Sequence, residues 1–78
     1  MQPNRTTRLF GLVVRKRRER QNLSQEKLAY RAKLNPGYIS RLERGLREPK
    51  LGTIVQIAEG LDTSLPTLMS DLERRLKR

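Results

Sequence analysis

The fold of this chain is decided by a short stretch, "LNPGYISRLERG", residues 34–45. Asn35 is a favourable N-cap, and Pro36 at the first helical position loses only an N–H that would have no partner inside a helix. Gly45 supplies a left-handed stop at the other end. We therefore predict a short helix from Pro36 to Arg44.

The two faces of this predicted helix have different characters. One face carries Ile39 and Leu42, which predict contact with a core, and it also carries Glu43 where a core residue would be expected. The opposite face has almost no side chain at its front and two guanidinium groups behind. Its residues are Gly37, Ser40, Arg41 and Arg44.

A second short helix is predicted immediately before this one. Ser24 is its N-cap, and the helix runs from Gln25 to Ala32, with the small Ala29 on an inner face that another helix can approach closely. Residues 33–34 make a tight connection. Two short helices joined in this way define a helix-turn-helix, whose second helix fits the major groove of B-DNA.

The rest of the chain is also predicted to be helical. Apolar residues recur at helical spacing, and no segment alternates with a period of two, so the fold class is all-α with five helices. We expect one domain spanning residues 1–78, with a core of about 6–72 and frayed tails at 1–5 and 74–78. The remaining helices are predicted to start at Thr6 or Thr7 and end near Asn22, to span 51–61, and to start after Ser64.

Composition limits the function. The chain has 18 Lys+Arg against 8 Asp+Glu, a net charge of +10, which favours an anionic polymer as partner. It has neither Cys nor His, so thiol chemistry, structural zinc and the commonest general base are excluded. The longest apolar run is too short for a signal peptide or a membrane span. We expect a cytoplasmic protein that is not an enzyme and that uses no cofactor, metal or small-molecule ligand.

The residues that carry a family resemblance lie between Phe10 and Leu68. The combination Ser24-Gln25, Leu28-Ala29, Ile39, Leu42-Glu43, Gly45, Pro49, Ile57-Ala58 and Leu61 resembles the five-helix, lambda-repressor-like helix-turn-helix domain of Cro, lambda repressor and XRE-like transcriptional regulators. In size the chain is similar to the controller proteins of restriction–modification systems. The resemblance implies a buried ion pair between Arg18 and Glu43, which would explain the glutamate on the core face; a paired buried charge is tolerable, whereas a lone one is costly.

The resemblance also implies a mode of DNA recognition. Arg41 is the principal candidate for reading a base, because a guanidinium can bind guanine O6 and N7 together. Ser40 is its neighbour, Gly37 lets the backbone approach the DNA, and Pro36 can meet a thymine methyl. Gln25, Tyr38, Arg44 and Lys50 are expected at phosphates, and Arg47 at a phosphate or a base; each keeps the alternative of a solvated surface residue.

Pro36 and Gly37 depart from the family pattern, in which the first turn of this helix often presents polar side chains to base edges, and two other positions also depart from it. Lys33 stands in the turn where glycine or asparagine is common, so it is expected to carry backbone strain. Lys50 replaces the usual Ser or Thr cap of the fourth helix, which gives up about 1 kcal/mol of capping.

An apolar stripe on the last helix predicts a homodimer. Leu65 and Leu68 are expected to close the core, whereas later members of the stripe lack a partner within the chain, and exposed apolar stripes usually mark interfaces. A two-fold dimer would place two recognition helices about 34 Å apart on a near-palindromic operator. The predicted interface residues are Val55, Met69, Leu72 and Leu76.

The leading hypothesis is thus a homodimeric, sequence-specific regulator that binds double-stranded DNA. The alternative is an antitoxin or adaptor whose helical surface chiefly binds another protein. An RNA-binding role is disfavoured because aromatic residues make up only 4% of the chain.

Overall fold

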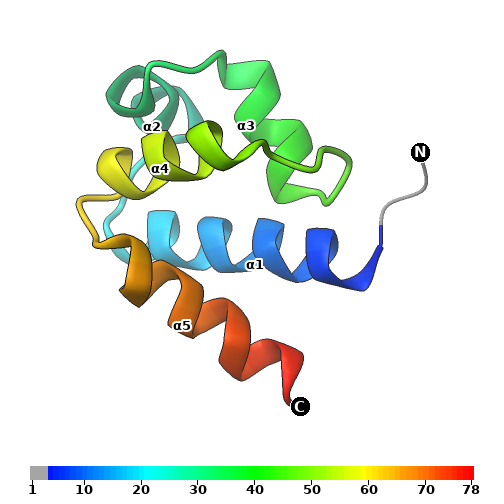
Figure 1. Cartoon of the computed structure of the whole chain (residues 1–78). Helices are drawn as coiled ribbons and strands as arrows, with labels where there is room; N and C mark the ends of the chain where they lie inside the picture. The colour runs from blue at the N-terminus through cyan, green and yellow to red at the C-terminus, as the bar shows by residue number, and fades with distance from the viewer. Residues whose placement is uncertain (1–3) are drawn as a thin grey trace.

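The computed structural model describes residues 4–78. This part of the chain contains five helices and no strands (Figure 1). The predicted all-α class is therefore confirmed, and the observed ends of the second, third and fourth helices and the start of the fifth differ from the predicted ones by one residue at most. The helices are α1 (Arg5–Arg20), α2 (Gln25–Ala32), α3 (Pro36–Glu43), α4 (Leu51–Gly60) and α5 (Leu65–Leu76).

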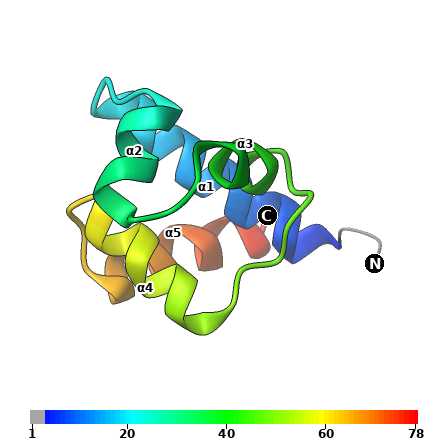
Figure 2. The same ribbon diagram turned by 90° about the horizontal axis from the view of Figure 1, so that it is seen from above.

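The helix α1 lies across the middle of the molecule, with α2, α3 and α4 on one side of it and α5 on the other (Figure 1). The helix α2 packs against both α3 and α4, and seen from above α3 lies over α1 (Figure 2). Apolar side chains from all five helices close the core. Its buried members are Phe10, Val13, Val14, Leu28, Ala29, Ala32, Ile39, Leu42, Ile57, Ala58, Leu61 and Leu68.

The start of α1 differs from the prediction. Asn4, not Thr6 or Thr7, is the N-cap, and its side-chain oxygen accepts a hydrogen bond of 2.8 Å from the backbone N–H of Thr7. Thr7 lies within the first turn, and its buried hydroxyl donates to Glu48 at 3.2 Å. Sequence alone favoured the threonines because they directly precede the apolar residues, whereas asparagine is at least as good a cap.

Left-handed residues follow four of the helices, with Asp62 at φ 53° after α4. Asn22 has φ 58°, as its position after α1 predicted, and Lys33 has φ 60° in the turn between α2 and α3. Lysine in this region is strained, so the expected cost at Lys33 is present. Gly45, at φ 76°, could not carry a side chain, because a Cβ there would lie 3.0 Å from the Cα of Arg8. The stop after α3 is thus fitted against α1.

The start of α1 contacts the end of α5. Residues 1–3 of the expected frayed tail lie outside the described residues, whereas Arg5 begins α1. Its guanidinium donates hydrogen bonds to the backbone oxygens of Arg75, Leu76 and Arg78 at 3.1–3.4 Å. These bonds satisfy carbonyls that the end of a helix leaves unpaired, so α5 stays helical to Leu76 where fraying was expected.

Within residues 4–78, none of the helices combines the length and the apolar character needed to cross a membrane.

Candidate nucleic-acid interface

The recognition candidate α3 is fixed by its inner face. Ile39 and Leu42 are completely buried, and the carboxylate of Glu43 is buried beside them. Close approach of α3 to α1 requires Gly11, because a Cβ at this residue would lie 2.3 Å from the backbone oxygen of Leu42. At the other end, the side-chain oxygen of Asn35 caps the helix by accepting from the N–H of Gly37 at 2.7 Å.

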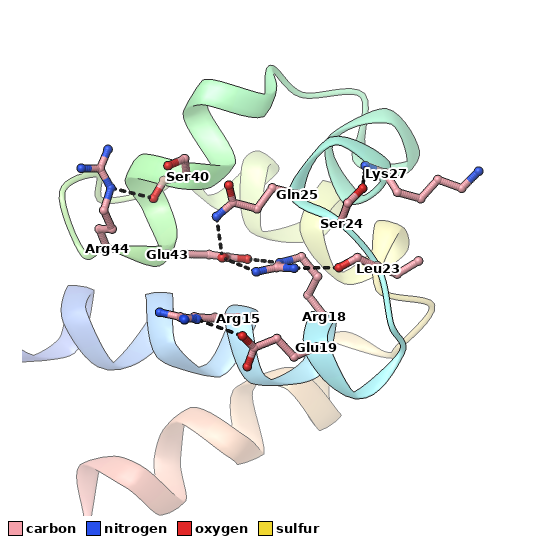
Figure 3. A network of polar contacts seen from close by, with 10 residues as sticks. All are labelled: Arg15, Arg18, Glu19, Leu23, Ser24, Gln25, Lys27, Ser40, Glu43 and Arg44. Carbon is pink, nitrogen blue, oxygen red and sulfur yellow. Dashed lines mark hydrogen bonds and ion pairs between the residues drawn. The ribbon is translucent and has the colours of Figure 1, made fainter.

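A polar network ties α3 to α1 and α2 (Figure 3). The Nε and Nη2 atoms of Arg18 donate to the two oxygens of Glu43 at 2.7 and 3.0 Å, and Nη1 donates to the backbone oxygen of Leu23 at 2.7 Å. The hydrogen bond with Glu43 raises the pKa of Arg18, against the opposing effect of burial. The ion pair expected from the resemblance is thus present. It is bidentate, and a third hydrogen bond holds the guanidinium at the backbone oxygen of Leu23.

Gln25 belongs to the same network. Its side-chain amide donates to Glu43 at 2.9 Å, a contact that the sequence did not indicate (Figure 3). An amide has two N–H donors, so this bond occupies one and orients the other. Gln25 lies at the first position of α2, where free backbone N–H groups also favour an anion. Its contact with a phosphate stays a prediction, now with a fixed side chain.

The outer face of α3 is polar and only partly covered. Pro36 and Arg44 are exposed, whereas Gly37, Ser40 and Arg41 are half-buried. The Nε of Arg44 donates to the backbone oxygen of Ser40 at 3.3 Å, which lays this guanidinium along the helix surface (Figure 3). The predicted base-reading residues thus share one side of one helix, away from α1.

The remaining phosphate candidates lie on α3, in the loop after it and at the start of α4. Tyr38 is half-buried and its ring packs against the core, while burial raises the pKa of its hydroxyl; the charge of Arg47 and a side-chain hydrogen bond from Thr53 act in the opposite direction. Lys50 is exposed and gives α4 no side-chain cap, as predicted. Tyr38 on α3, Arg47 in the following loop and Thr53 on α4 therefore lie near one another.

Thr53 is a further candidate for a phosphate contact, which was not predicted from the sequence. It lies in the first turn of α4, and its hydroxyl is near that of Tyr38. The available signal was a hydroxyl residue within the first turn of a helix that lacks a capping side chain at Lys50.

One expectation about the last helix was wrong, whereas the role of its apolar residues in a dimer stays a prediction. Met69 and Leu72 were expected to lack a partner within the chain, but both are half-buried and pack against the core. With Phe10 and Ile54 they also line an apolar hollow of about 130 Å³. Phe10 on α1 and Ile54 on α4 lie beside this part of the stripe, so it has apolar partners within the chain. Val55, at 40% exposure, and the half-buried Leu76 remain on the surface.

A second ion pair on α1 was also missed. The Nε of Arg17 lies 2.5 Å from a carboxylate oxygen of Asp71 on α5, and Arg74 pairs with the other oxygen. Burial acts to raise the pKa of Asp71, yet the hydrogen bond and charge of Arg17, with the charges of Arg74 and Arg20, lower it overall. The signal was an acid three residues after the core residue Leu68.

Among residues 4–78 no group of three or more potential ligands gathers around a metal position. The geometry is that of a short helix presented on the surface by a rigid support, with arginines at its exposed side. The sequence pattern of the helix-turn-helix family matches residues 14–68, and the chain belongs to this family of regulators.

Similar proteins include the controllers of restriction–modification systems. The chain is 46% identical to control protein C.BamHI of Bacillus amyloliquefaciens over 54 residues, which cover 68% of this chain and 67% of that one. It is 38% identical to control protein C.MunI of Mycoplasma sp. over 66 residues, which cover 83% and 89%. Other relatives are longer: the match spans 26% of the regulator y4dL of Sinorhizobium fredii.

A solved structure agrees with this relationship. The controller protein C.Esp1396I, as a tetramer in complex with its natural 35 base-pair operator, superposes with a TM-score of 0.91 at 27% identity, over 96% of this chain and 99% of that one.

Proposed function

We propose that the protein is a sequence-specific transcriptional regulator that binds a near-palindromic operator in double-stranded DNA as a homodimer, with α3 in the major groove. The observation that carries this proposal is the outer face of α3, which is polar, basic and small at its front, on a helix whose inner face is locked to α1 and α2. A helix held in this way enters the groove without having to order itself first. Its site of action would be the cytoplasm, with the DNA.

The proposal divides the surface into two roles. Arg41 reads a base, with Ser40 beside it, while Pro36 and Gly37 let the helix approach the base edges. The phosphate residues fix the register of the protein on the duplex but carry no sequence information of their own. They are Gln25, Tyr38, Arg44, Arg47 and Lys50, to which the geometry adds Thr53; Arg47 retains a base contact as its alternative.

Selection of bound duplexes from a random pool tests the proposed specificity. The expected result is enrichment of an inverted repeat whose half-sites lie about one turn, or 34 Å, apart. If no sequence is enriched and the free protein sediments as a monomer, the proposal is wrong. The antitoxin or adaptor alternative would then account for the family membership.

Val55→Asp tests the dimer. The Val55 side chain is 40% exposed and lies outside the buried core, so a charge there should leave the melting temperature nearly unchanged. In a dimer that buries this residue the two carboxylates would be desolvated and would repel one another, so sedimentation should show a monomer. Tyr30→Asp, at a residue that is 80% exposed on α2, is the matched control and should remain dimeric. A dimeric Val55→Asp protein would place the interface elsewhere.

A further inference from the structure

The guanidinium of Arg41 lies beside Gly37, one helical turn ahead of its own position. A methyl group at Gly37 would lie 3.3 Å from Nη1 and 3.9 Å from Cζ of Arg41. Side chains on a helix lean toward its N-terminus, so residues four apart meet in this way. The head of Arg41 therefore lies in tight contact with the place that a methyl group at position 37 would take, and it would have to shift by a few tenths of an ångström to admit one.

No hydrogen bond holds the Nε of Arg41. Its Nε is buried, and within residues 4–78 it is the one buried side-chain nitrogen or oxygen without a hydrogen-bond partner. A buried unpaired donor is unfavourable, so the conformation must be set by packing. The neighbouring feature that makes room for it is the missing side chain of Gly37.

This position matters because the front of α3 offers no reading group of its own. Pro36 and Gly37 have no side-chain donor or acceptor, and they occupy the first turn, the part of a recognition helix that meets base edges. A guanidinium brought forward from Arg41 supplies N–H donors that this turn lacks, from its two outer nitrogens.

We propose that Gly37 is a specificity-determining positioning residue, which acts by leaving the space through which Arg41 reaches the front of the recognition helix. The recognised group is a guanine edge in the major groove, bound by the two outer nitrogens of Arg41. The proposal rests on the proposed function for its DNA part, whereas the placement of Arg41 by Gly37 can be measured in the free protein.

The first test uses the protein without DNA. In Gly37→Ala the new methyl should push the flexible head of Arg41 outward by a few tenths of an ångström and so loosen the packing around its buried Nε. The side-chain N–H of Arg41 should then exchange with solvent faster than in the wild type, as measured by nitrogen-15 NMR. Gly52→Ala is the matched control, because it also adds a methyl in the first turn of a helix but meets nothing within 4 Å. Equal exchange rates in the wild type and Gly37→Ala would overturn the placement.

The second test is a double-mutant cycle on the selected duplex and on duplexes changed at one base pair. Arg41→Ala should lose about ten- to a hundredfold of discrimination at one base pair per half-site. Gly37→Ala should lose discrimination at the same base pair, and adding it to Arg41→Ala should change nothing further. A methyl at position 37 also comes within 3.0 Å of the capping oxygen of Asn35, so melting temperatures are compared to separate an effect on the cap.

The outcomes are distinguishable. If Gly37→Ala weakens binding equally with and without Arg41, Gly37 acts through backbone approach and the inference is overturned. If the wild type selects no duplex although Gly37→Ala releases Arg41 in the NMR experiment, the placement is supported and the proposed function fails.

Discussion

The two faces of α3 are built from neighbouring residues of one helix, yet they differ in almost every physical respect. On the inner face, Ile39 and Leu42 are completely buried, and Glu43 accepts hydrogen bonds from Arg18 and Gln25. On the outer face, Arg41 has a buried nitrogen without a partner. Polar groups on the inner face are satisfied within the fold, whereas the outer face keeps donors unused. If the outer face recognises DNA as proposed, stability and recognition lie on opposite sides of the same short helix.

Glu43→Ala should break the inner face and have the largest effect. It leaves Arg18, whose side chain is 12% exposed, without its carboxylate, and it removes the acceptor of Gln25. The expected cost is about 3–5 kcal/mol in the free energy of unfolding, a large share of what a small domain has. Urea denaturation measures it. Glu73→Ala, which breaks an exposed pair with Lys77, is the control and should cost less than about 0.5 kcal/mol. Similar costs for both variants would contradict the account.

Asp71→Asn tests whether the inner face of α3 is special, because it breaks a second ion pair made by α1 at a different helix. The expected cost is about 2 kcal/mol near neutral pH, since a hydrogen bond between charged groups is lost. The Asp71 carboxyl has a lowered pKa in the folded state, so its contribution is present above the unfolded value of about 4 and disappears as the pH falls through the folded pKa.

The stabilities of Asp71→Asn and the wild type should therefore converge as the pH is lowered from about 5 toward 2, as followed by thermal melts. Glu19→Gln, at an exposed pair with Arg15 that also lowers the pKa of this carboxyl, should show a much smaller difference with the same direction of pH dependence. Because Asp71 holds α5 and not α3, base discrimination should be retained. A gap between Asp71→Asn and the wild type that stays constant with pH would contradict this role.

Arg44→Ala sharpens the comparison from the outer face, with a smaller effect. Arg44 is exposed and makes one backbone hydrogen bond, so the melting temperature should hardly change. As a phosphate contact it should weaken binding to selected and scrambled duplexes alike, and it should reduce the slope of log K against log salt by about 1 for each subunit. Titrations at several salt concentrations measure this. A loss confined to the selected duplex would make Arg44 a base reader.

The sequence predicted most of the architecture because its signals were local. Ser24, Asn35 and Ser64 cap the helices that they were expected to cap, and Gly45 ends α3 in the left-handed conformation. Such signals depend on a few neighbouring residues and on backbone geometry alone. The presence of Glu43 on a core face was also visible, and the family resemblance supplied Arg18 as its partner.

Features that depend on contacts between distant helices were harder to predict. Asp71 is 54 residues from Arg17, and no spacing rule pairs an acidic residue with a basic residue on a separate helix. Met69 and Leu72 belong to the core only because α1 and α4 present Phe10 and Ile54 to them. The position of the Arg41 side chain beside Gly37 could not be predicted for a different reason. A spacing of four residues permits contact but does not show which rotamer is taken.

Arg41→Ala tests the central claim, that the outer face of α3 reads sequence while its inner face maintains the fold. The measurement is the affinity of this variant and of the wild type for the selected duplex and for a scrambled one, together with a melt of each protein. The account predicts an unchanged melting temperature, a loss of about 1–3 kcal/mol on the selected duplex and little change on the scrambled one. An equal loss on both duplexes, or a melting temperature lowered as in Glu43→Ala, would contradict it.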